Sequence, residues 1–285
     1  MTELLNWLLD DKNPAIKYRT QTELLGLSVE SSDAKQWAFS KLPENWYETK
    51  GQWYGYYITA LAECGLSSSD IPEEYLNRAF HELETEFDCE CKHFMLLTAL
   101  MKLGFSNHKV IQNLIETLNT IILPDGGFLC LHRVNKLEYT PKSCYKNNLQ
   151  ALMFVAECHK NGINVKFKQL LLDYFLNRNI FYQSTNKTAL VLNNREGWRT
   201  IDVFYPFEPT RVGLQNVVES FSAMGYGNDK RLQEAWSILD NQKDEAGRVL
   251  LKGTLTKSYL PKERIGQPSK WATFYTLLAE AERSK

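Results

Sequence analysis

One passage of this chain occurs twice, and it constrains the fold more than any other feature. Residues 99–109 (ALMKLGFSNHK) lead into a helical stretch and then into residues 125–128 (DGGF). Residues 220–230 (SFSAMGYGNDK) lead into a second helical stretch and then into residues 244–249 (DEAGRV), and a weaker copy begins at residue 60. The copies recur at about 40 residues or a multiple of it, which indicates a repeated supersecondary unit.

Two kinds of helical segment alternate along the chain. A helix that is hydrophobic on every side must be surrounded by protein, whereas an amphipathic helix covers a core with one face. The pattern predicts further helices at both ends, and in total about six helical hairpins arranged as an inner and an outer ring. The hydrophobic segments are 53–65, 93–104, 144–160 and 211–225; the amphipathic ones are 72–86, 108–123, 165–178 and 229–242; the others are 3–10, 14–26, 33–41 and 269–283.

These hairpins predict a single all-α domain over residues 1–285, with the helices of residues 1–50 at its periphery. Two arrangements use the same hairpins: a closed α/α toroid, and an open superhelix of the kind that HEAT and TPR repeats build. We expect the toroid. Its inner helices would then surround one cavity, with an apolar floor and a rim that carries cysteine side chains.

Composition excludes several classes of function. The chain has 33 basic and 34 acidic residues and a net charge of −1, so it lacks the basic excess of a nucleic-acid-binding protein. Its first residues lack the cationic region of a secretory signal, and no apolar run approaches the length of a transmembrane helix. We therefore expect a cytoplasmic protein whose six cysteines are thiols or metal ligands.

The repeated turn resembles a known superfamily. The DGGF turn, the Ala-Leu-x3-Gly pattern at 60–65 and 99–104, and the closing segment 266–271 (GQPSKW) are similar to the α/α-toroid superfamily of squalene-hopene-type terpenoid cyclases and protein prenyltransferase β subunits. Within it, the closing segment is most similar to small bacterial repeat proteins of unknown activity. The resemblance covers roughly residues 50–283 and implies a toroid. The Asp-x-Asp-Asp motif, whose crowded carboxylates let class II cyclases protonate an alkene, does not occur in the sequence.

Soft metal ligands gather around two predicted inner helices. Cys91 precedes one of them, Cys130 and His132 follow the DGGF turn, and Cys144 precedes the next inner helix. In a toroid these segments meet at one end, and thiolate and imidazole are ligands that zinc prefers. The alternative is that the cysteines are small buried hydrophobic residues, and their spacing fits no standard zinc signature. We predict no cofactor and keep zinc as the alternative.

Candidate ligand-binding residues lie at the starts of the predicted inner helices. Aromatic side chains there could line a cavity for an apolar molecule, or simply form the core. A basic side chain beside a helix N-terminus opposes the helix dipole, which suggests an anionic partner, although a solvated charge at the rim explains it too. The aromatic candidates are Trp53, Tyr54, Tyr57, Tyr145 and Trp271, the basic ones Lys142, Arg211 and Lys270, and the turn adds Asp125.

Two functions fit these observations. In the first, a non-catalytic toroid binds a small apolar or amphipathic molecule, isoprenoid-like or anionic, in its central cavity, with a protein partner at its rim as a further option. In the second, the chain is a small terpenoid-cyclase-like or prenyltransferase-like enzyme acting on an isoprenoid. A fold hosts many functions, so the site must decide between them.

Overall fold

The computed structural model describes residues 2–49, 52–129, 143–191, 201–206, 211–254 and 260–285. Within these ranges the chain forms helices, turns and a few isolated β-bridges, and it contains no β-strand. The prediction of an all-α protein is confirmed. Among the helices of the described ranges, none combines the length and the hydrophobicity that crossing a membrane requires.

The helices match the predicted segments to within a few residues at most ends. The hydrophobic ones are α4 (Gln52–Glu63), α6 (Cys91–Lys102), α9 (Tyr145–Lys160), α11 (Leu214–Ala223) and α13 (Lys270–Arg283). The amphipathic ones are α5 (Glu73–Thr85), α7 (Lys109–Ile121), α10 (Lys168–Leu176) and α12 (Gln233–Asn241). The N-terminal part has α1 (Thr2–Leu8), α2 (Pro14–Arg19), the π-helix η1 (Thr20–Leu24) and α3 (Ser32–Lys41). Short 3-10 turns are η2 (Trp46–Glu48), η3 (Ser68–Asp70) and η4 (Lys230–Leu232).

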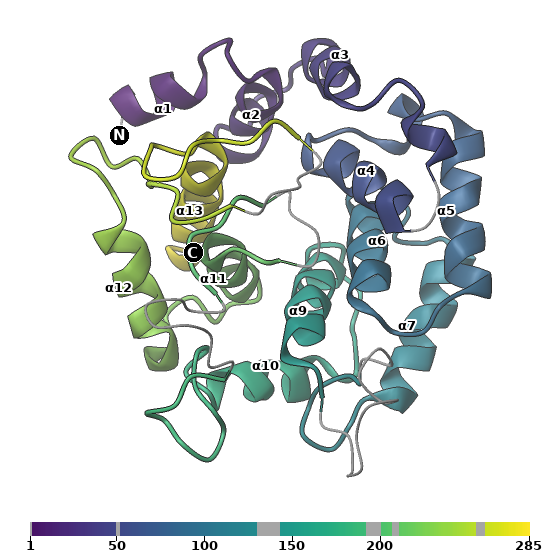
Figure 1. Ribbon diagram of the computed structural model, residues 1–285, viewed down its shortest axis with the longest axis vertical. Coiled ribbons are helices and arrows are strands. Elements are labelled where there is room, and N and C mark those ends of the chain that lie inside the picture. The colour runs from purple at the N-terminus through teal and green to yellow at the C-terminus, as the bar shows by residue number, and fades with distance from the viewer. Residues whose placement is uncertain (1, 50–51, 130–142, 192–200, 207–210, 255–259) are drawn as a thin grey trace.

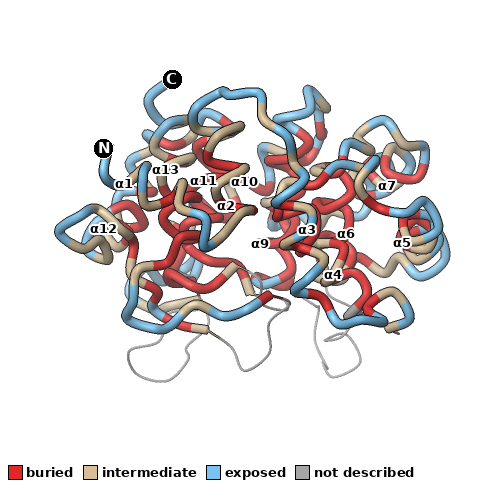
Figure 2. Tube along the Cα trace, turned by 90° about the horizontal axis from the view of Figure 1, so that it is seen from above, coloured by how far each residue is buried: buried red, intermediate tan, exposed pale blue. Residues whose placement is uncertain are grey.

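The hydrophobic helices lie side by side in the middle of the molecule. They pack in the order α4, α6, α9, α11 and α13, and α13 also packs against η1 and α2. Figure 1 shows these helices around the centre, with α5, α7, α10 and α12 outside them. Figure 2 shows that the central helices are mostly buried, whereas α5, α7 and α12 expose one side. The predicted alternation of buried and half-exposed helices is therefore confirmed.

The repeated turn makes the same contact in both copies. The backbone N–H of Phe128 donates to Asn148 Oδ1 at 2.8 Å, and the backbone N–H of Val249 donates to Thr273 Oγ1 at 2.9 Å. Asn148 and Thr273 are both the fourth residue of the following inner helix, α9 and α13. Each turn thus fixes the start of the next inner helix against the end of the preceding outer helix.

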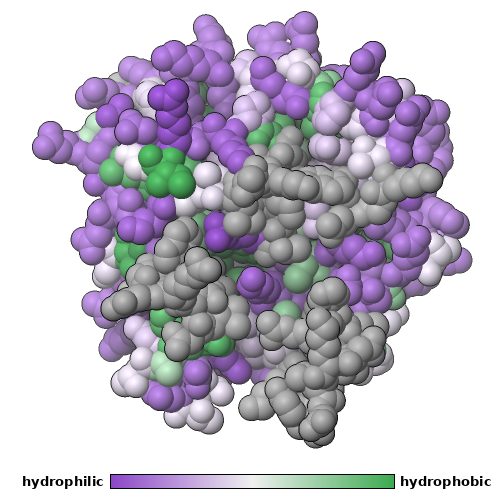
Figure 3. Space-filling view, in the orientation of Figure 1, coloured by the Kyte–Doolittle hydropathy of each residue, from purple (hydrophilic) through white to green (hydrophobic). Residues whose placement is uncertain are grey.

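Several connections between the helices are short, among them 103–108, 161–167 and 224–229 after inner helices and 86–90 before α6. Three longer segments, 122–144, 177–213 and 242–269, precede α9, α11 and α13, and the structure describes each of them only in part. Figure 3 shows one face of the molecule, on which hydrophilic residues predominate among the coloured atoms. Long connections on a rigid scaffold are the usual place for binding residues.

The glycine at the centre of the DGGF turn yields a stability prediction. Gly126 has φ +85°, and an added Cβ would lie 2.3 Å from the carbonyl oxygen of Leu170. We expect Gly126→Ala to destabilise the protein by about 2–4 kcal/mol, because a strained φ and a backbone clash add. Gly104 is the control: its φ is +97°, but nothing lies within 4 Å of an added Cβ. Urea unfolding of both variants measures the difference, and equal losses would contradict the role of the clash.

Candidate binding site among the inner helices

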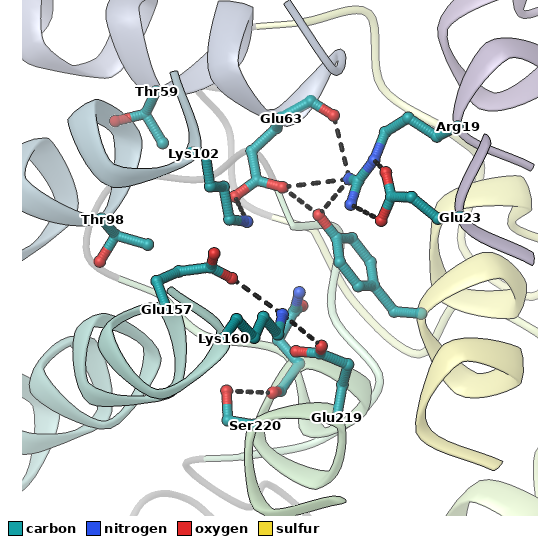
Figure 4. A network of polar contacts seen from close by, with 12 residues as sticks. Arg19, Glu23, Thr59, Glu63, Thr98, Lys102, Glu157, Lys160, Glu219 and Ser220 are labelled. Carbon is teal, nitrogen blue, oxygen red and sulfur yellow. Dashed lines mark hydrogen bonds and ion pairs between the residues drawn. The ribbon is translucent and has the colours of Figure 1, made fainter. Parts of the chain in front are cut away.

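Charged side chains meet at the C-terminal ends of the inner helices. Glu63, Lys102 and Lys160 are the last residues of α4, α6 and α9, and each stands two positions before a glycine. Arg19 is the last residue of α2. The repeat therefore places side chains of equivalent position at the same end of neighbouring helices, and the negative end of each helix dipole favours Lys102 and Lys160. Figure 4 shows these residues facing one another.

Glu63 is the centre of the first part of this network. Lys102 Nζ lies 2.5 Å from Glu63 Oε1, and the Tyr275 hydroxyl on α13 donates to Glu63 Oε2. Arg19 Nη1 donates to the Glu63 backbone carbonyl at 3.0 Å and to Tyr275 Oη at 2.8 Å, and it lies 3.4 Å from Glu63 Oε2. Glu23 holds the other side of the Arg19 guanidinium, at 2.5 and 2.8 Å. One buried carboxylate thus joins α2, α4, α6 and α13.

Lys160 is the centre of the second part. Its Nζ donates to Glu157 Oε1 at 2.8 Å and to Glu219 Oε1 at 2.6 Å. Glu157 lies on α9 and Glu219 on α11, and both are buried. Lys160 itself is partly exposed, with 36% of its side-chain surface accessible. The ammonium group therefore ties α9 to α11 at the point where the network meets solvent.

The cations of the network lower the pKa of two of its carboxyl groups. Burial alone would raise the pKa of Glu63, but Lys102 and Arg19 outweigh burial and lower it. Burial would likewise raise the pKa of Glu157, and Lys160 and Lys102 lower it instead. A carboxyl with a lowered pKa does not hold a proton near neutral pH, so neither residue suits the role of a general acid. Sequence reasoning missed this network because each charge alone looks like a surface residue at a helix end.

A small cavity lies between the inner helices. It offers about 20 Å³ to the centre of a water molecule, enough for roughly one water. The sequence predicted an apolar floor, but six of the ten lining residues are polar or charged, because equivalent positions of successive helices carry threonine, amide and charged side chains. The lining consists of Thr59, Glu63, Met95, Thr98, Gln150, Met153, Pro206, Arg211, Val212 and Asn216.

Most of the aromatic candidates serve as core. Tyr54 is fully buried, stacks on Trp46, and its hydroxyl donates to the Tyr75 carbonyl. Tyr145 is buried and donates to the Ile180 carbonyl, and Trp271 is buried in the same core. Tyr57 is half-buried against Trp46. None of these four lines the cavity. The side chain of Trp53 lies outside the described part of the structure.

The charged candidates have different surroundings. Arg211 lines the cavity, with its guanidinium 4.0 Å from the centre of the Phe204 ring. Lys270 Nζ lies 2.5 Å from Asp10 Oδ1, so the carboxylate of Asp10, rather than a ligand, pairs with this ammonium group. Asp125 accepts a hydrogen bond from Ser143 Oγ at 2.7 Å and holds the DGGF turn against the start of α9. Lys142 lies outside the described residues.

The metal candidates lie partly outside the described residues. Cys91 is the first residue of α6 and is half-buried, and Cys144 is buried directly before α9. Cys130 and His132 fall in the segment that the structure does not describe. In the part that it does describe, no three His, Cys, Asp or Glu side chains are grouped as a metal ion requires. The zinc site stays an untested alternative.

Comparison of the chain with protein-family models, curated proteins and solved structures finds no match. The similarity to terpenoid cyclases and prenyltransferase β subunits therefore stays an expectation from the repeated motifs, and the function must be argued from the geometry.

The Lys102–Glu63 pair yields a prediction for stability. We expect Lys102→Met to destabilise the protein by about 3 kcal/mol, because it leaves a buried carboxylate short of a partner. A lowered pKa means that Glu63 stabilises the fold above its unfolded pKa and loses this effect as the pH falls through its folded pKa. The cost of Lys102→Met should therefore shrink in acid.

Urea unfolding at pH 7 and in acid measures this cost. Lys166→Met is the matched control, because Lys166 and Glu116 form a pair 3.4 Å apart whose side chains are 73% and 69% exposed. Such pairs contribute about 0–1 kcal/mol. Equal losses in the two variants would contradict the importance of the buried pair.

Glu263 yields a separate pH prediction. It accepts hydrogen bonds from the Ser269 hydroxyl and from the Lys270 N–H at the start of α13, and burial raises its pKa to about 7. A raised pKa gives the fold an advantage that is complete below the ordinary glutamate pKa of 4.5 and disappears as the pH rises to about 7. Wild-type stability should therefore fall relative to Glu263→Gln over this interval, measured by urea unfolding. An exposed-site variant, Glu245→Gln, should show no such trend.

Proposed function

We propose that the inner helices close into an α/α toroid that binds a small molecule in its central cavity without chemical conversion. The contact of α13 with η1 and α2 supports closure, because it joins the last inner helix to the N-terminal part of the chain. The Arg19 and Tyr275 bonds to Glu63 support it too, because they link α2, α13 and α4 across the whole length of the chain. In an open superhelix the first and last helices lie at opposite ends and do not contact each other.

The observation that carries the binding function is the cavity lining. Side chains from α4, α6, α9 and α11 all reach the same small space, together with residues that precede α11. A concave site with a few convergent polar groups is typical of small-molecule binding. The methionine side chains among the lining, Met95 and Met153, are unbranched and adapt their shape, so a molecule larger than one water can be admitted.

The paired charges favour binding over catalysis. A cyclase of class II type needs a carboxyl group that holds a proton, whereas Lys102, Arg19 and Lys160 lower the pKa values of Glu63 and Glu157. The terpenoid-cyclase-like or prenyltransferase-like enzyme remains the alternative. It would be supported if the purified protein converted geranyl or farnesyl diphosphate into a new product.

Filling the cavity tests the binding function. Thr98 lines the cavity, so Thr98→Met adds side-chain volume inside it. The Thr98 hydroxyl donates to the Phe94 carbonyl at 2.7 Å, and the substitution removes this bond. We expect that at least one compound from a panel of isoprenoid alcohols and small organic acids raises the melting temperature of the wild type and not that of Thr98→Met. The measurement is a thermal-shift assay.

The control for this experiment is Thr85→Met on the exposed surface of α5, where the threonine makes the same kind of bond, to the His81 carbonyl at 2.7 Å. It should respond like the wild type. A panel in which no compound stabilises the wild type more than Thr98→Met would overturn the proposed function.

A further inference from the structure

A larger cavity lies between the loop before α6, the end of α7 and the DGGF turn. Its volume is about 330 Å³, against about 20 Å³ for the central cavity. Sites for small molecules typically measure roughly 300–1,000 Å³ and have mainly apolar walls. The wall here is mainly apolar too, and it is formed largely by Phe87, Ile121, Leu123, Phe128 and Leu129.

Asp88 is the charged residue of this lining. Its Oδ1 accepts the Glu90 N–H at 3.3 Å and lies 2.7 Å from His93 Nδ1. Burial lowers the pKa of His93 to about 4, so near neutral pH the imidazole holds the carboxylate in place without neutralising it. In the described part of the chain, no lysine or arginine lies within 4 Å of the Asp88 carboxylate. A cation inside the cavity would therefore meet a carboxylate that the fold leaves without one.

Two fully buried polar side chains hold the loop that carries Asp88. His93 on α6 contacts Asp88, and Asn147 on α9 donates from Nδ2 to the Cys89 carbonyl at 2.6 Å. Among the described residues, the other polar atom of each, His93 Nε2 and Asn147 Oδ1, has no hydrogen-bond partner. Unpaired buried atoms of this kind are rare, because they lose water and gain nothing.

The backbone of the same loop is strained. Cys89 has φ +60°, a conformation that residues other than glycine seldom adopt. Strained residues and unpaired buried groups persist where surrounding structure fixes one conformation, and they are frequent at ligand sites. The loop is thus held rigidly beside the cavity at a cost to stability.

We propose that this cavity binds an apolar primary amine, at a site separate from that of the proposed function. The ammonium group of the amine would pair with Asp88, and its hydrocarbon part would pack against the rings of Phe87 and Phe128. An amine is favoured over an alcohol because its charge strengthens the hydrogen bond to a carboxylate. A carboxylic acid is disfavoured because its negative charge would be repelled.

The first test compares three molecules of similar shape: phenethylamine, 2-phenylethanol and 3-phenylpropionate. Isothermal titration calorimetry at pH 7 and equal ionic strength measures their binding to the wild type. We expect phenethylamine to bind about tenfold more tightly than 2-phenylethanol, and 3-phenylpropionate to bind more weakly than either. No binding of phenethylamine, or equally tight binding of either comparison compound, would overturn the proposal.

The second test removes the charge. Asp88→Asn keeps the shape of the side chain, so phenethylamine should bind about tenfold more weakly and 2-phenylethanol as before. Glu116→Gln is the matched control, because it removes an exposed carboxylate from α7, the helix that also contributes Thr117 and Ile121 to the cavity. It should leave both affinities unchanged. Wild-type affinity for the amine in Asp88→Asn would contradict the inference.

The third test locates the site and does not depend on Asp88. Thr117 lines the cavity and is exposed, so Thr117→Phe should fold and weaken the binding of the amine and the alcohol by about tenfold or more, because the added ring occupies their space. Thr120→Phe, at an exposed position of the same helix outside the lining, should bind both normally. Unchanged binding in Thr117→Phe would overturn the inference.

The Thr98→Met variant separates this site from the central cavity. It fills the central cavity and should bind phenethylamine like the wild type. Loss of phenethylamine binding in Thr98→Met together with normal binding in Thr117→Phe would place the amine in the central cavity, which would overturn this inference and leave the proposed function standing.

Discussion

The carboxylate of Glu63 is the contact on which the arrangement of the inner helices depends. Removing a carboxylate from water costs several kcal/mol, and only well-placed partners offset this cost. Here the partners come from α2, α6 and α13, as Arg19, Lys102 and Tyr275. Three helices must therefore stand within hydrogen-bond distance of the end of α4. Apolar packing alone would tolerate small shifts between helices, whereas this network does not.

Satisfying the network leaves a contrast inside the same core. The charged groups at the helix ends are paired, whereas the Gln150 side chain, nearer the start of α9, lines the small cavity. The cavity has room for roughly one water, which is enough to hydrogen-bond an amide. The two ends of α9 thus meet polar surroundings of different kinds: two carboxylates around Lys160, and a polar cavity beside Gln150.

Helix positions were predictable from the sequence, whereas the network was not. Period and hydrophobicity predicted α4 to α13 because burial of an apolar side chain is decided by its own helix. The repeat also held a signal for the network, since Glu63, Lys102 and Lys160 each stand two residues before a glycine. Their pairing is nonlocal, however, and Tyr275 and Arg19 approach Glu63 from opposite ends of the chain. For the site, the sequence pointed to Arg211 through its position before a helix, but an amide such as Gln150 carries no pattern of its own.

Lys270 and Arg211 show why a basic residue at a helix start is an incomplete argument for a ligand. Both oppose the dipole of the helix that follows. Lys270 is matched by Asp10, and the carboxylate of Glu263 accepts the Lys270 N–H, so the chain itself supplies anions where a ligand was expected. Arg211 instead reaches the cavity beside Gln150 and Asn216. The two side chains differ in what they contact: Lys270 lies beside a carboxylate, and Arg211 lies over the Phe204 ring at the cavity. A cation near a helix start is therefore evidence for an anionic ligand only after the contacts of its side chain in the fold are known.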